Sequence, residues 1–223
     1  MMSNLFSMFD PSNNMNYSLN WSTTLIILLF IPLSFWIIPS RFNILWLTMY
    51  KKINTEINSV MQNSKSKKSK LILTSFFTLI LLNNMLSMFT YIFPPSSHLV
   101  FSLSLALPFW LSLMIFNMKN KLMNFSASLV PQGTPIMIAP FMVLIELMSN
   151  MIRPMTLSIR LSTNITAGHL IMKLIENMME KEEILMKSAI VLQWLIIALE
   201  MMMTIIQAYV FSILSTMYLK ETH

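Results

Sequence analysis

The chain has 223 residues, of which 55% are hydrophobic and 11% are charged, a balance typical of an integral membrane protein rather than a soluble domain. It contains no cysteine, which excludes disulfides, thiolate catalysis and cysteine-ligated metals. The net charge of +6 does not indicate nucleic-acid binding, because the lysines flank apolar runs and do not alternate with aromatic residues.

The first half of the chain contains three uncharged apolar runs. Each is close to the roughly 20 residues that cross the hydrocarbon core of a bilayer. We therefore expect membrane helices over residues 21–38, 71–93 and 99–117. The last two are joined by PPSSH, residues Pro94–His98, which is so short that the two helices must be antiparallel.

Residues 42–61, between the first two runs, follow a different pattern. Apolar side chains recur there every three or four residues, while Arg41, Lys51 and Lys52 occupy other positions. This pattern predicts an amphipathic helix that lies on the membrane surface, followed by the solvated run KSKKSK.

The last third of the chain predicts two helices that are longer than the bilayer is thick, over residues 135–178 and 184–219. Pro135 is placed to open the first, and Pro154 is placed to bend it. At about 1.5 Å per residue, both helices must tilt steeply or lie partly along the membrane. The sequence thus predicts one all-α integral membrane domain, with about five membrane helices and one surface helix, that ends in a long tilted helical hairpin.

The loop charges predict the orientation of these helices. The amino-terminal segment and the loop 176–187 are net acidic. Residues 41–70 and the loop 118–134 are net basic, and the carboxyl-terminal tail on their side is neutral, since Lys220 and Glu221 cancel. By the positive-inside rule the basic side faces the cytoplasm or matrix, and the amino terminus lies on the opposite side.

Both long helices carry polar residues at helical spacing, although they are otherwise apolar. The stripe on the first consists of Glu146, Asn150, Arg153, Arg160 and Asn164, and the stripe on the second consists of Gln193, Glu200, Thr204 and Gln207. Ionisable groups at bilayer depth usually face a protein interior or a water-filled cavity. We therefore expect the two stripes to face each other, water, or both.

These polar residues have structural as well as functional interpretations. Asparagine and glutamine often form simple interhelical hydrogen bonds, Arg153 is equally well explained as a packing residue, and a hydrogen-bonded role suits His169. Arg160 is harder to explain, because the nearest carboxylate on its face, Glu146, is roughly 20 Å away along the helix axis. A permanently charged guanidinium without a partner in its helix indicates a partner on another chain.

The residues around these stripes resemble a known family. IRLSTNITAGHL (Ile159–Leu170), LVPQGTPIMIAPFMVLIELMSNMIRP (Leu129–Pro154) and LEMMMTIIQAYVFSILSTMYL (Leu199–Leu219) are similar to subunit a of F-type ATP synthases. The segments NLFSMFDPS and TYIFPPSSHLVFSLSLALPFWL resemble its insect mitochondrial members. The acidic loop ENMMEKEEILMK departs from the pattern of the family.

The resemblance implies a stator subunit that carries protons to and from a rotating ring of c subunits and does not itself catalyse phosphoryl transfer. It implies that Arg160 is the essential arginine and that Glu146 belongs to the matrix-side path. The same resemblance places four residues in the half-channel from the intermembrane side: Asn164, His169, Glu200 and Gln207. No metal and no cofactor are expected.

The resemblance also implies partners and a location. The partners are the c-ring, the peripheral-stalk subunit b, subunit 8 and the lipid bilayer, within a dimeric ATP synthase complex. The location is the mitochondrial inner membrane, with the amino terminus in the intermembrane space and the carboxyl terminus in the matrix.

Two other classes stay open on the residues alone. A secondary transporter would show internal repeats and glycine-rich breaks, whereas this chain has no evident repeat and only two glycines. A structural subunit of a respiratory complex would keep its polar stripe inside one bundle. ATP hydrolysis by the chain itself is not expected, because the phosphate-binding pattern GxxxxGK[ST] is absent from the sequence.

Overall fold

The computed structural model describes residues 6–12, 18–32, 38–61, 67–89, 92–120, 137–179 and 186–222, and also residues 123, 126, 129, 130 and 135. Every regular element within these residues is a helix, as the all-α class requires. Three helices of this described part are long and apolar enough to cross a membrane, over Ser69–Ser87, Leu99–Lys119 and Ile190–Lys220.

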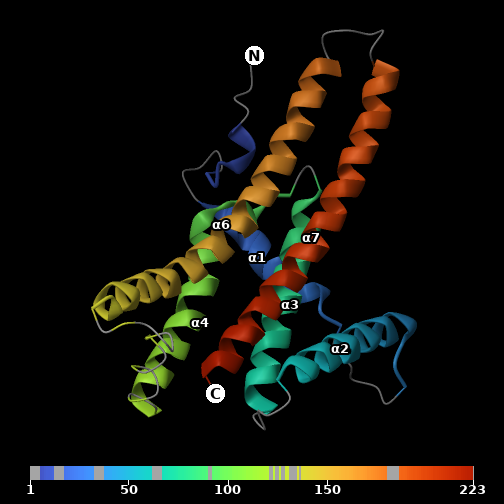
Figure 1. Ribbon diagram of the computed structural model, residues 1–223. Coiled ribbons are helices and arrows are strands. Elements are labelled where there is room, and N and C mark those ends of the chain that lie inside the picture. Colours follow the sequence, from blue (N-terminus) through green and yellow to red (C-terminus); the bar gives the residue numbers. More distant parts are fainter. Residues whose placement is uncertain are drawn as a thin grey trace.

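The two longest helices are α6 (Ala139–Met179) and α7 (Met186–Thr222). Helix α6 begins four residues later than expected, so Pro135 precedes the helix and does not open it. The two helices pack against each other as an antiparallel pair that rises beyond the other helices (Figure 1). Helix α6 changes direction along its length in this view, and Pro154 lies buried inside it. The residues of the acidic loop from 180 to 185 lie outside the described part of the chain.

Helices α3 (Lys67–Ser87) and α4 (Leu99–Asn120) flank this pair. They are antiparallel and are connected at one end through the short helix η4 (Pro95–Ser97), and α3 packs mainly on α7 while α4 packs mainly on α6. Helix α3 ends at Ser87, before the expected boundary at residue 93. The apolar run indicates which residues lie in the membrane, and these residues need not all be helical. Pro94 follows the run and disfavours the helical conformation in the residue before it.

The single helix expected over residues 21–38 is not continuous. Three short helical segments follow one another instead: η2 (Leu19–Ser22), α1 (Thr23–Ile26) and η3 (Ile27–Phe30). Ile31 is extended, with ψ of 116°, because Pro32 follows it and disfavours the helical conformation. Residues 33–37 of the expected helix lie outside the described residues.

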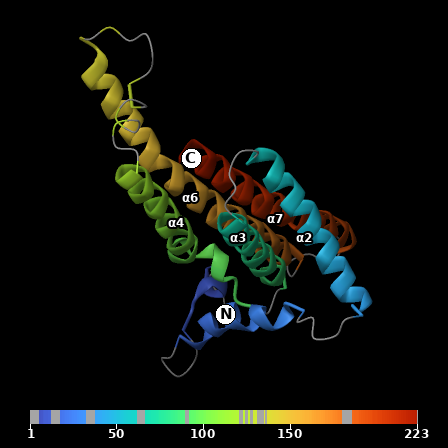
Figure 2. The same cartoon turned by 90° about the horizontal axis from the view of Figure 1, so that it is seen from below.

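Helix α2 (Arg41–Val60) lies close to the amphipathic helix expected over residues 42–61. Its first turn is capped by Ser40, whose side chain accepts a hydrogen bond from the Asn43 backbone N–H at 3.4 Å. Ile53 and Ile57 on its apolar face are buried, and α2 crosses beside α3 and α7 (Figure 2).

The apolar core lies where α2, α3, α4, α6 and α7 meet. Phe76 of α3 is central to the aromatic contacts, with ring centroids 5.6 Å from Phe109 of α4 and 6.5 Å from Phe211 of α7. Leu157 and Leu161 of α6 are buried in the same cluster. This core fixes the rotation of α6 and therefore decides which of its side chains face outward.

Candidate functional site

Two polar side chains join α6 to α7. The amide Nδ2 of Asn164 donates a hydrogen bond to Oε1 of Gln207 at 3.1 Å. Gln207 is buried and Asn164 is half-buried. Because amide groups inside a membrane bundle find their partners on neighbouring helices, this bond holds the two polar stripes against each other.

About one turn along α6 from Asn164, Gly168 faces Glu200 of α7. A Cβ at position 168 would overlap the Glu200 carboxylate and would lie 2.9 Å from its Cγ. Glu200 is only 6% exposed, and within the described residues neither carboxylate oxygen has a hydrogen-bond partner. Glycine at position 168 therefore provides the space in which a buried carboxyl group lies against the α6 backbone.

His169 points into a different part of the bundle. Its ring is 1% exposed and makes an edge contact with Phe9, with the ring centroids 6.3 Å apart. The backbone of Ser87 at the end of α3 lies next to the ring, but neither imidazole nitrogen makes a well-formed hydrogen bond to the described part of the chain. The amino-terminal segment thus covers His169, while Arg160 on the same helix is exposed.

Sequence reasoning missed two asparagines on α3. Asn83 and Asn84 are buried. Of their side-chain amide atoms, only Nδ2 of Asn83 is hydrogen-bonded within the described residues, to the Leu79 carbonyl at 2.9 Å. The hydroxyl of Thr204 on α7 lies 3.8 Å from Sδ of Met85, next along α3. Two adjacent asparagines in an otherwise apolar run were the signal that could have identified this position.

Several buried side-chain polar atoms have no hydrogen-bond partner in the described part of the chain. They lie on α3, α6 and α7 and at the short helix η4, and among them are atoms of Asn83, Asn84, His169, Glu200 and Gln207. Buried polar groups in folded proteins are nearly always satisfied by protein or by water. This set offers carboxyl, imidazole and amide groups, which together can bind water and exchange protons.

Arg160 lies outside this buried set. Its side chain is exposed on α6, next to the buried residues Leu157 and Leu161, and it makes no ion pair with any residue that the structure describes. At about 1.5 Å per residue, Arg160 is roughly 12 Å from Gly168 along the helix axis. Its positive charge is thus available to a group from outside this chain.

Glu146 and Arg153 form a separate pair on α6. Their nearest side-chain atoms are 3.7 Å apart, and the Arg153 guanidinium lies 5.6 Å from the ring centre of Tyr218 on α7. Asn150, on the same helix, and Gln193 on α7 are only half-buried, and the structure brings neither into the Asn164–Gln207 pair. The predicted stripe therefore divides into the Glu146–Arg153 pair, exposed Arg160 and the buried polar set.

These features define a class of protein: a multi-pass membrane protein that combines an outward-facing arginine with buried polar side chains on its long helices, as expected of an ion-translocating subunit. The chain belongs to the ATP synthase A chain family, whose model matches residues 2–220. It is 46% identical over 225 residues to ATP synthase subunit a of Locusta migratoria. The identity is 45% over 224 residues for the Drosophila melanogaster subunit and 44% over 226 residues for that of Anopheles quadrimaculatus. In each case 100% of both chains is covered.

Membership of this family decides among the three functions that the sequence left open. The chain is a proton-translocating stator subunit of the ATP synthase complex, and it is neither a secondary transporter nor a structural subunit of a respiratory complex.

Proposed function

We propose that α6 and α7 carry the proton path of this ATP synthase subunit, with Arg160 as the barrier between two half-channels. The observation that carries the proposal is the position of Arg160. Its exposed side chain lies between the buried Glu200 region on one side and the Glu146–Arg153 pair on the other, without an ion pair among the described residues.

The half-channel from the intermembrane side is formed by the buried polar set around Glu200, His169, Gln207 and Asn164. Leaving a buried polar group unsatisfied costs about 1–3 kcal/mol. Several such groups occur on the facing helices α3, α6 and α7, so a hydrated route satisfies them better than a dry core does. Glu200 is the proton-exchanging carboxyl group, His169 lies beside the route under Phe9, and the Asn164–Gln207 bond sets the spacing of the helices.

Arg160 acts on the carboxyl groups of the c-ring. A guanidinium keeps its charge under all physiological conditions, so it stabilises the ionised form of a ring carboxylate that rotates past it. A carboxyl group that reaches Arg160 loses its proton to the matrix-side path and, after passing the arginine, takes another from the intermembrane side. The fixed charge also repels a proton that would cross directly, so proton flow requires rotation.

Glu146 receives protons on the matrix side. Its side chain is 37% exposed, and its carboxylate pairs with Arg153, whose guanidinium contacts the ring of Tyr218. A partly exposed carboxylate at this position connects the ring to the solvent of the matrix. The matrix-side role of Glu146 and the packing role of Arg153 are therefore compatible.

The assembly and location follow from the same scheme. The polar face of α6 and α7 meets the c-ring, the remaining surface meets the bilayer and stator subunits such as subunit b and subunit 8, and the complex is a dimer in the mitochondrial inner membrane. Acidic loops on one side and basic loops on the other favour an amino terminus in the intermembrane space and a carboxyl terminus in the matrix.

The substitution Arg160→Lys tests the barrier. A lysine can lose its charge in a membrane environment and lacks the planar fork of a guanidinium, so respiration-driven ATP synthesis in inner-membrane vesicles should be abolished while the complex still assembles. Arg153→Lys is the matched control, because it makes the same chemical change at a residue paired within the chain. Near-normal synthesis by the Arg160→Lys complex, or an equal loss in both variants, would contradict the proposal.

A further inference from the structure

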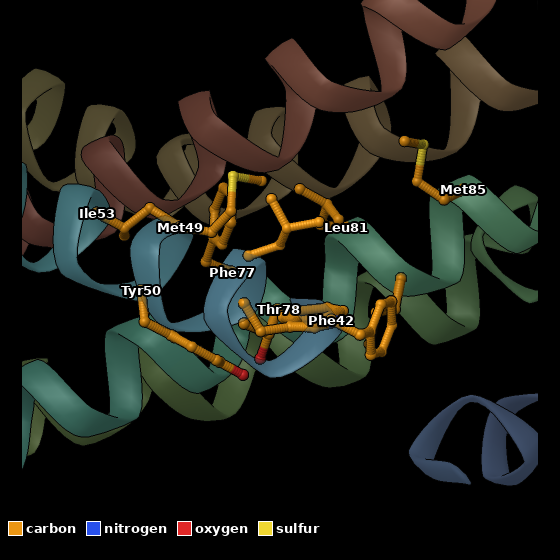
Figure 3. Close-up of a pocket in the computed structure, with 11 residues that line it drawn as sticks. Phe42, Met49, Tyr50, Ile53, Phe77, Thr78, Leu81 and Met85 are labelled. Atoms are coloured by element: carbon orange, nitrogen blue, oxygen red, sulfur yellow. The ribbon is translucent and has the colours of Figure 1, made fainter. Parts of the chain in front are cut away.

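An apolar pocket of about 330 Å³ lies where α2 crosses α3. Figure 3 shows Phe42, Met49 and Ile53 of α2 and Phe77 and Leu81 of α3 converging on it. Trp46, which also lines the pocket, makes ring contacts with Phe42 and Tyr50 along α2. The proton path does not use this pocket, whose walls are formed largely by aromatic and aliphatic side chains.

A second hollow, with a different character, adjoins the first. It has a volume of about 640 Å³ and is lined by Lys51, Asn54 and Asn58 of α2 and by Lys70 of α3, among others. Tyr50 lines both hollows, so the two meet at this side chain. No carboxylate is among the described residues that line the second hollow, which therefore has a net positive charge.

The two hollows lie at different depths along α3. Lys70 ends the basic run, and the apolar run begins at the next residue. At about 1.5 Å per residue, Phe77 and Met85 lie roughly 10 Å and 22 Å beyond Lys70, within the reach of a hydrocarbon core that is about 30 Å thick. The basic hollow thus lies at the membrane interface, and the apolar pocket extends into the lipid layer.

We propose that these adjoining hollows bind one anionic glycerophospholipid. The phosphate lies between Lys51 and Lys70, with Asn54 and Asn58 as additional hydrogen-bond donors, and one acyl chain enters the apolar pocket beside Trp46. Charge complementarity selects the anionic headgroup. The lipid fills the angle between the surface helix α2 and the membrane helix α3, and so fixes the position of α2.

The test uses the purified ATP synthase complex that contains this subunit. Phospholipids that remain after detergent washing are extracted and quantified by mass spectrometry for the wild type and for Lys51→Gln/Lys70→Gln. The double variant should lose about one anionic phospholipid per copy of the subunit. Lys52→Gln/Lys119→Gln removes the same charge from exposed residues that line neither hollow, and it should retain that lipid.

A second arm examines the acyl-chain pocket. Met49 is 48% exposed and lines the pocket, so Met49→Trp fills space without disturbing the buried core, and it should also release the lipid. Washed wild-type complex should rebind phosphatidylglycerol from vesicles at least tenfold more tightly than phosphatidylcholine. Equal lipid retention by all variants, equal binding of the two lipids, or a cryo-EM map with a protein segment in the pocket would each overturn the proposal. Should Lys51→Gln/Lys70→Gln fail to assemble, Met49→Trp and the rebinding measurement decide.

Discussion

The carboxylate of Glu200 lies over Gly168, in the space that a Cβ at position 168 would occupy. The two residues belong to different helices, so their contact depends on the register in which α6 and α7 pack. The same register brings Asn164 to Gln207 and Arg153 to Tyr218. A single packing arrangement therefore positions the buried acid, the bridging amides and the paired arginine together.

The contact predicts that Gly168→Ala impairs function more than folding. Alanine is the better helix former by about 1 kcal/mol, and the group that must move is the flexible end of a side chain. Displacing this carboxylate by about 1 Å should lower respiration-driven ATP synthesis by about tenfold or more. Ile171→Ala, at an exposed position on the same helix, should leave synthesis near the wild-type rate. Unchanged synthesis in assembled Gly168→Ala complexes would show that Glu200 need not lie here.

The ends of a helix were predictable from the sequence where a capping residue and a regular apolar face mark them. Helix α2 has a serine cap at Ser40 and a regular apolar face, and its observed ends differ from the expected ones by one residue. The first apolar run misled the prediction because hydropathy outweighed the helix-breaking effect of Pro32. Hydropathy also placed the end of α3 too late, since apolar residues after Ser87 leave the helix.

The candidate site was predictable only in part. Helical spacing placed Asn164 and Gln207 on facing stripes, and the hydrogen bond between them joins those stripes. Spacing within one helix carries no information about the register between two helices, so the Gly168–Glu200 contact could not be foreseen. The approach of Phe9 to His169 brings together residues separated by most of the chain, and no local pattern marks it.

The Asn164–Gln207 hydrogen bond predicts unequal effects of the same substitution at two glutamines. Gln207→Met removes the bond and keeps a side chain of similar length, at a cost of about 0.6 kcal/mol for a typical interhelical bond in a membrane. This loss is too small to prevent assembly, so the expected result is slower ATP-driven proton pumping. Gln193→Met, at a half-buried position, should pump nearly as fast as the wild type. Acidification of inner-membrane vesicles measures the pumping rate of each variant. Equal pumping rates in Gln207→Met and Gln193→Met would exclude a special role for the Asn164–Gln207 bond.

The contact between Phe9 and His169 predicts that replacing Phe9 makes the His169 imidazole more accessible to a chemical reagent. Phe9→Ala removes the ring that contacts the imidazole, so diethyl pyrocarbonate should modify His169 several-fold faster, as peptide mass spectrometry can quantify. His98 provides an internal control, because its ring contacts are with Trp21 and Phe93 and do not involve Phe9. Phe9→Leu, which retains an apolar cover, should stay close to the wild-type rate. Identical rates in all three proteins would mean that Phe9 does not limit access to His169.

The pair formed by Glu146 and Arg153 predicts a defect on the matrix side. Both side chains are about one-third exposed, so breaking the pair by Glu146→Gln should change stability by about 0–1 kcal/mol at most. Passive proton conductance through vesicles stripped of the catalytic sector should nevertheless fall, because the variant lacks a carboxyl group that accepts protons. Glu56→Gln, on the exposed face of α2, controls for loss of a carboxylate and should conduct normally.

The double variant Glu146→Gln/Arg153→Gln separates two causes of such a defect. Suppose the conductance falls only because the ion pair between Glu146 and Arg153 is broken; neutralising Arg153 as well should then restore proton flow. A proton-carrying role for Glu146 predicts instead that the double variant conducts as poorly as Glu146→Gln alone, since the missing carboxyl group is not replaced. Recovery in the double variant would therefore leave Glu146 with a packing role and place the matrix-side path elsewhere on α6 or α7.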